Sequence, residues 1–140
     1  MSSPFSSALF RTKLLLYFDF EASHSLDTRE EPHPHFWKTV LTFSGDPIKG
    51  RIVDFPSLEA SMLKTLESLP GCYLNTNDVL LPATRAFPTC ETIGESIATL
   101  IHEKTLAEFR VENPSLRLLS VQVTLCEGAR VFGSAITELL

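Results

Sequence analysis

The 140-residue chain lacks the features that mark several large classes of protein. It has only three cysteines, which are widely spaced and form no Cys-x-x-Cys pair. This argues against a disulfide framework or a cysteine-based zinc site. Basic side chains number 12 against 17 acidic ones, and the net charge of −5 argues against a nucleic-acid-binding module. No apolar run approaches the roughly 18 residues of a membrane span. The first ten residues lack the basic start of a signal peptide.

The composition itself is that of an ordinary globular domain, with 44% apolar and 21% charged residues. No internal repeat, low-complexity tract or long linker divides the chain. This length suits one domain with its own hydrophobic core. We therefore expect a single soluble, cytoplasmic domain over residues 1–140, with a flexible tail at residues 1–11.

Four segments have the composition or the alternation of β-strands. Residues 13–22 and 35–44 are rich in aromatic and aliphatic side chains and are short for buried helices. Residues 116–125 and 129–136 are the third and fourth predicted strands, and Gly128 is predicted to turn the chain between them.

Two helices are predicted between these pairs of strands. The first, capped by Asp54 or Ser57 and stopped by Pro70-Gly71, has apolar residues at spacings of four, four and three: Leu58, Met62, Leu66 and Leu69. The second begins after the N-cap Thr89, with residues 75–88 as a loop before it. The order ββααββ predicts an α+β fold, a four-stranded antiparallel sheet with both helices on one face. The open edges of such a sheet favour self-association.

Three of the four histidines, His24, His33 and His35, fall within twelve residues. His33 and His35 point to the same face of an extended chain, with about 6.5–7 Å between their Cα atoms. If the first two strands form a hairpin, His24 joins them at one end of the sheet. Three neutral imidazoles with an open fourth position are typical of a catalytic zinc site. A solvated His-x-His loop is the alternative on spacing alone; His102 is predicted to lie on the surface.

From about Phe18 to Phe132 the chain resembles the 6-pyruvoyl-tetrahydropterin synthases and the bacterial 6-carboxy-tetrahydropterin synthases. Five short motifs carry the resemblance, in the order and spacing of the family: Phe20-Glu21-Ala22-Ser23-His24, His33-Pro34-His35, Gly50-Arg51-Ile52-Val53-Asp54-Phe55, Tyr73-Leu74-Asn75 and Pro88-Thr89-Cys90-Glu91. The resemblance implies the tunnelling fold, trimers or hexamers with sites at subunit interfaces, and Zn²⁺ held by His24, His33 and His35. It also implies a substrate of the 7,8-dihydroneopterin triphosphate type.

The catalytic residues that the resemblance implies are replaced in this chain. The position of the family's cysteine holds Arg29, which stays protonated and cannot act as a base. The Asp-His couple that works with this cysteine aligns with Pro70 and Gly71, neither of which titrates. The glutamate that anchors the pterin aligns with Leu125, and Glu127 lies two residues, about 6.5–7 Å, further along the strand. Only a local bulge would return Glu127 to the pterin position.

Three interpretations therefore remain. The first is a zinc-dependent lyase of pterin or 7-deazaguanine (queuosine precursor) biosynthesis with altered chemistry. Some relatives use a glutamate in place of the cysteine, so Glu30 and Glu31 are its candidate bases, with Cys72 as a relocated thiol. Thr89 and Glu127 are the candidate substrate contacts. The second is a pterin- or metal-binding homologue without turnover, and the third is a structural paralogue that associates through its sheet edges.

Overall fold

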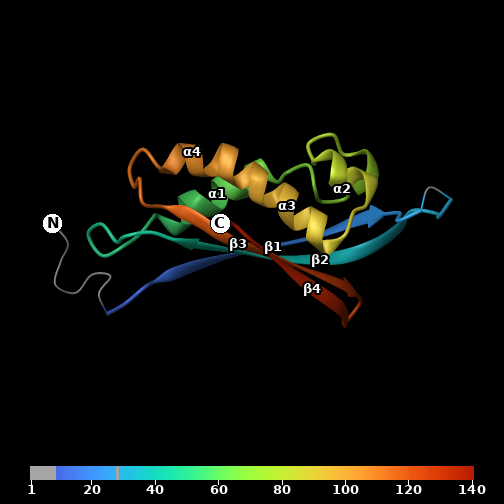
Figure 1. The fold of residues 1–140 in the computed structure, drawn as a ribbon, viewed down its shortest axis with the longest axis horizontal. Helices are drawn as coiled ribbons and strands as arrows, with labels where there is room; N and C mark the ends of the chain where they lie inside the picture. The colour runs from blue at the N-terminus through green and yellow to red at the C-terminus, as the bar shows by residue number, and fades with distance from the viewer. Residues whose placement is uncertain (1–8, 28) are drawn as a thin grey trace.

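The computed structural model describes residues 9–27 and 29–140, so most of the expected tail at residues 1–11 lies outside it. Its four strands form one antiparallel sheet in the order β1-β2-β3-β4: β1 (Lys13–His24), β2 (His33–Ser44), β3 (Arg117–Glu127) and β4 (Arg130–Glu138). The main helices α1, α3 and α4 cover the same face of this sheet (Figure 1). The predicted α+β class and the ββααββ order are therefore confirmed. Within the described residues, no helix is long and apolar enough to span a membrane.

Helix α1 (Phe55–Thr65) begins where its sequence predicts, because the Asp54 carboxylate accepts a hydrogen bond from the backbone N–H of Ser57. The predicted end at Pro70 is wrong. The helix stops at Thr65, and two successive turns carry the chain onward while still burying Leu66 and Leu69. Pro70 restricts only the backbone of its neighbour Leu69, so it does not account for an end at Thr65, and apolar spacing alone overestimates the helix here.

Helix α3 (Cys90–Leu100) follows the predicted N-cap Thr89. It continues through a π-helical turn, η2 (Ile101–Thr105), into α4 (Leu106–Phe109). The wider turn accompanies a buried Thr105 whose hydroxyl lies 2.8 Å from that of Thr65 on α1. A polar contact between hydroxyl groups thus joins the two helical segments.

The predicted loop over residues 75–88 contains two short helical segments, η1 (Leu74–Thr76) and α2 (Pro82–Ala86). Pro82 suits the first turn of a helix because that position needs no N–H donor. The Thr84 hydroxyl lies 2.6 Å from the Ser96 hydroxyl and docks α2 on α3. Five residues are too few to show a helical period, so the loop prediction is wrong at this point.

Alternation along β1 and β2 decides which side chains face the helices. Phe20 and Ala22 of β1 and Trp37 of β2 are buried beneath them, whereas Tyr17, on the opposite face of the sheet, is 65% exposed. His24 is in phase with Ala22, and His35 is in phase with Trp37. The predicted cluster therefore lies on the helix-covered face, at the end of the hairpin.

Candidate metal centre

The register of the β1–β2 hairpin brings the three histidines together. His24 pairs with His33 across the strands, and Ala22 pairs with His35. Each residue offers one ring nitrogen, and these atoms all lie within 4.8 Å of one another. The three ring centroids are 4.6 to 4.9 Å apart. The structure thus forms the cluster that the spacing predicts, whereas the more distant His102 is exposed.

Contacts behind two of the rings determine which nitrogen is free. Nδ1 of His24 lies 2.8 Å from the Pro88 carbonyl, and a carbonyl only accepts, so Nδ1 carries the proton and Nε2 keeps its lone pair. Nδ1 of His33 lies 3.0 Å from Oε1 of Glu30 and 3.3 Å from the Glu31 carbonyl, so the same reasoning applies. Nδ1 of His35 is buried without a hydrogen-bond partner among the described residues.

The surroundings of two of the rings, those of His24 and His35, favour the neutral form. Burial is the main cause that lowers the pKa of His24, with His33 adding to it and the Pro88 carbonyl opposing it. Burial also lowers the pKa of His35, helped by His24 and His33 and opposed by the nearby Glu127 carboxylate. Neutral imidazoles are the form that binds a metal ion. Three converging imidazoles, one with an orphaned buried nitrogen, fit Zn²⁺ with a fourth position left open.

Aromatic side chains on β2 and β4 lie against the histidine cluster. The indole ring of Trp37 lies 5.2 Å from the ring of His24, and its Nε1–H donates to the Ala22 carbonyl at 3.1 Å. On β4, the Phe132 ring lies 5.9 Å from that of His35, and the Arg130 guanidinium carbon lies 4.8 Å above Phe132. Sequence reasoning missed Phe132 and Arg130. Their position depends on a bulge that no local pattern predicts.

That bulge also bears on Glu127. Leu125 pairs with Gly133 and Cys126 pairs with Val131, so the extra residue belongs to β4 and not to β3. The pairing of β3 with β2 continues without a break through Leu125 and Cys126. Glu127 is exposed at the end of β3, opposite Arg130, and the bulge does not move it back along its own strand.

The candidate bases lie in different settings. The Glu30 carboxylate contacts His33, whereas Glu31 is exposed and its carboxylate makes no hydrogen bond or ion pair with the residues that the structure describes. Cys72 packs against the core, and its carbonyl accepts the Ser23 N–H at 3.0 Å. Burial raises the pKa of the Cys72 thiol, which keeps it protonated.

Thr89 stands close to the cluster because the carbonyl of its neighbour, Pro88, accepts the hydrogen bond from His24. Its hydroxyl accepts from the backbone N–H of Thr92 at 3.2 Å, and the Thr92 hydroxyl accepts from the Thr89 N–H at 3.1 Å. This reciprocal pair is a capping box. Thr89 therefore has a structural task, and a role toward a substrate stays a prediction.

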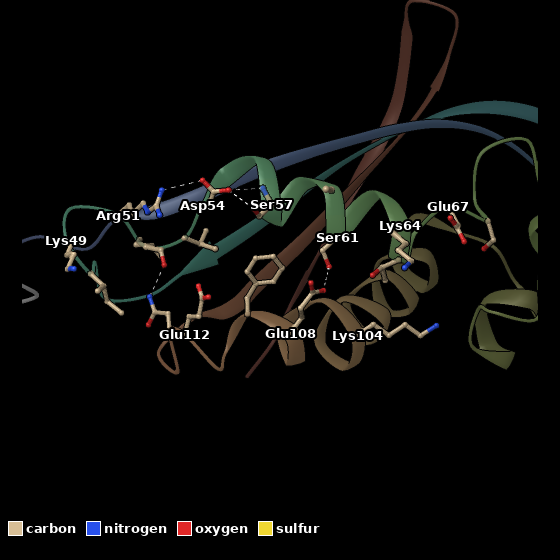
Figure 2. A pocket seen from close by; sticks show the side chains of 18 of the residues that line it. Lys49, Arg51, Asp54, Ser57, Ser61, Lys64, Glu67, Lys104, Glu108 and Glu112 are labelled. Atoms are coloured by element: carbon tan, nitrogen blue, oxygen red, sulfur yellow. Dashed lines mark hydrogen bonds and ion pairs between the residues drawn. The ribbon is translucent and has the colours of Figure 1, made fainter.

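A separate groove of about 1360 Å³ runs between α1 and the η2–α4 segment and includes none of the three histidines. Ser61 donates to the Glu108 carboxylate across it at 3.0 Å (Figure 2). Its lining carries charges of both signs: Lys49, Arg51, Asp54, Lys64, Glu67, Lys104, Glu108 and Glu112. This mixture defines no single class of ligand, so the histidine cluster is the stronger candidate site.

Solved structures share this fold. The 6-pyruvoyl tetrahydropterin synthase of Caenorhabditis elegans superposes with a TM-score of 0.68 at 16% identity, covering 94% of this chain and 100% of that one. The Plasmodium vivax enzyme gives 0.60 at 18% identity, with 93% and 99% covered. An uncharacterized protein of Wolinella succinogenes gives 0.65 at 14% identity, with 94% and 99% covered. These likenesses establish the tunnelling fold.

A search of the curated proteins found no match to the chain. The family model for 6-pyruvoyl tetrahydropterin synthase, in contrast, matches residues 13–132. This range contains β1 to β3, the start of β4, the main helices and the complete histidine cluster. The chain therefore belongs to the 6-pyruvoyl tetrahydropterin synthase family.

Proposed function

We propose that this protein is a zinc-dependent lyase acting on a substrate of the 7,8-dihydroneopterin triphosphate type, in pterin or queuosine-precursor biosynthesis. Membership of the family supports a tetrahydropterin synthase-like function. The observation that carries the proposal is the convergence of three ring nitrogens within 4.8 Å on the helix-covered face of the sheet.

His24, His33 and His35 would hold the ion, and each ring is supported in its place. When bound, Zn²⁺ supplies Lewis-acid chemistry that makes protons beside coordinated hydroxyls more acidic. The Trp37 ring, in contact with His24 and His35, limits how far these rings can turn. Phe132 lies against His35 from the β4 side and shields that ring from water.

The group that moves the substrate's protons must differ from the cysteine and the Asp-His couple, because Arg29, Pro70 and Gly71 occupy those places. A Plasmodium vivax family member has been solved as a variant in which a catalytic glutamate is replaced by alanine. This supports a carboxylate, Glu30 or Glu31, over the protonated thiol of Cys72. Glu31 has the freer carboxylate of the two.

Thr89 and Glu127 are the proposed substrate contacts. Glu127 is exposed and close enough to His35 to influence its pKa, and a carboxylate there could accept two hydrogen bonds from an amino-pyrimidine edge. β1 and β4 form the two edges of the sheet. We propose that copies join through these edges into a trimer or hexamer, so that a neighbouring subunit completes each site.

The test is incubation of metal-replete protein with 7,8-dihydroneopterin triphosphate, with triphosphate release and pterin products followed by chromatography. We expect product that depends on zinc and disappears in His33→Ala but persists in His102→Ala, the matched exposed histidine. The identity of the product would show which bond breaks.

The replaced catalytic residues favour one second candidate, a pterin- or metal-binding homologue without turnover. Fully metallated protein that binds 7,8-dihydroneopterin but forms no product would support it and contradict the enzyme. Protein that binds neither zinc nor pterin would contradict both and leave the structural paralogue.

A further inference from the structure

The ring of His33 is backed by a charged group, unlike the other two rings of the cluster. Nδ1 of His33 lies 3.0 Å from Oε1 of Glu30, and both side chains are 38% exposed. His24 has only the uncharged carbonyl of Pro88 at its Nδ1. A partly exposed ring, that of His33, thus has a carboxylate at its Nδ1, whereas the buried ring of His24 has an uncharged carbonyl.

The turn before β2 holds Glu30 in this place. Its backbone N–H donates to the Asp27 carbonyl at 2.8 Å. The Asp27 carboxylate accepts from the backbone N–H of Arg29 at 3.0 Å and from its guanidinium at 3.3 Å. These hydrogen bonds from Arg29 lower the pKa of the Asp27 carboxyl. Arg29, at the family's cysteine position, is thus part of the scaffold that presents Glu30.

We propose that Glu30 is a positioning residue that orients His33 toward the metal. A carboxylate at Nδ1 fixes the tautomer with its proton on Nδ1, which directs the Nε2 lone pair to the centre of the cluster. It also raises the basicity of the ring as a ligand. This inference rests on the proposed metal site, and it leaves Glu31 as the carboxylate free for proton transfer.

The neighbouring carbonyl limits the size of the effect. The Glu31 carbonyl lies 3.3 Å from the same Nδ1 and remains in every side-chain variant of either glutamate. Loss of the Glu30 carboxylate therefore weakens the support of His33 without abolishing it. Contacts of this type change metal affinity by about 10- to 100-fold, and we expect the lower end of this range.

The experiment compares the zinc and cobalt dissociation constants of wild type, Glu30→Ala, Glu30→Gln and Glu31→Ala by competition with a chelator. We expect about a tenfold weaker affinity for Glu30→Ala. Glu30→Gln should recover part of the loss, because its amide oxygen still accepts the Nδ1 proton. Glu31→Ala, one residue away, should stay within about twofold of wild type because its side chain does not reach the ring.

A spectroscopic measurement separates positioning from a general loss of structure. In ¹⁵N NMR spectra of the metal-free protein, the His33 Nδ1–H signal should shift in Glu30→Ala and remain in place in Glu31→Ala. Equal metal affinities for the two alanine variants, or an unchanged His33 signal in Glu30→Ala, would overturn the inference while leaving the proposed enzyme standing. Wild-type protein that binds neither metal would overturn both proposals.

Discussion

Two neighbouring parts of the molecule lie at the same end of β1. One is formed by side chains, whereas the other contacts the strand through its backbone. The histidine cluster places three side chains on the helix-covered face. The segment Pro70–Asn77 instead binds the backbone of β1, through Gly71 N–H to the Glu21 carbonyl at 2.7 Å and Ser23 N–H to the Cys72 carbonyl at 3.0 Å. The resemblance to the family predicts an Asp-His couple in this second part, where the chain has Pro70 and Gly71.

The difference shows that the end of one strand can present side chains on one face while its backbone edge pairs with another segment. Ligand geometry depends on strand register, which stays intact over the whole β1–β2 hairpin. The Pro70–Asn77 segment has side chains that do not titrate at its start, and a thiol that packs against the core. Its backbone pairs with the outer edge of β1, and its Tyr73 and Asn75 side chains hydrogen-bond Ser25 just after that strand.

The largest effect on zinc binding should come from removing one of the three histidines. His24→Ala should weaken zinc binding by at least about a hundredfold, because one of three ligands is lost from a site of large binding free energy. Competition with a chelator measures the change, and His102→Ala is the exposed control. Wild-type affinity in His24→Ala would show that the cluster is not the metal site.

The second contrast concerns the backbone of the Pro70–Asn77 segment. Gly71 has a φ of 75° with open space around it, so Gly71→Ala meets no clash but takes a left-handed conformation. We expect the free energy of unfolding to fall by about 1–2 kcal/mol in urea titrations, with zinc affinity unchanged. Gly133→Ala, with open space and no positive φ, should lose less. Equal losses of unfolding free energy in the two variants would show that the left-handed conformation of Gly71 is not the cause.

Acidification below about pH 6.5 should first affect the histidine cluster, before any carboxylate titrates. The folded state holds the pKa values of His24 and His35 below 6.5, so the unfolded chain binds more protons as the pH falls through 6.5. The free energy of unfolding of the metal-free protein should therefore be highest above about pH 6.5. It should decline as the pH falls below 6.5 toward the lowered pKa values. Urea titrations at several pH values, repeated with His24→Asn, would measure this. A decline of the same size in that variant would contradict the assignment to His24.

The smallest effect is expected at Cys72. Cys72→Ala removes one half-buried sulfur atom, so the free energy of unfolding should fall by about 1 kcal/mol or less. Turnover should stay within about twofold, and iodoacetamide should react slowly at pH 7 because the raised pKa leaves little thiolate. Loss of turnover with normal stability would instead make Cys72 the relocated thiol.

Local patterns were sufficient for much of this molecule. Alternation and composition predicted all four strands, and the caps Asp54 and Thr89 predicted where two helices begin. The spacing of His33 and His35 predicted their common face, because side-chain direction in a strand depends only on parity. These features need no information beyond a few neighbouring residues.

Tertiary structure decided the rest. The end of α1, the helix α2 and the π-helical turn before α4 depend on packing against other segments, which no local period reports. The β4 bulge sets Phe132 against His35, and the turn at Asp27 sets Glu30 against His33. The sequence by itself determined which residues could bind a metal ion. Only the folded chain decided which carboxylate supports that site and which remains free, because these contacts join residues through register and turns.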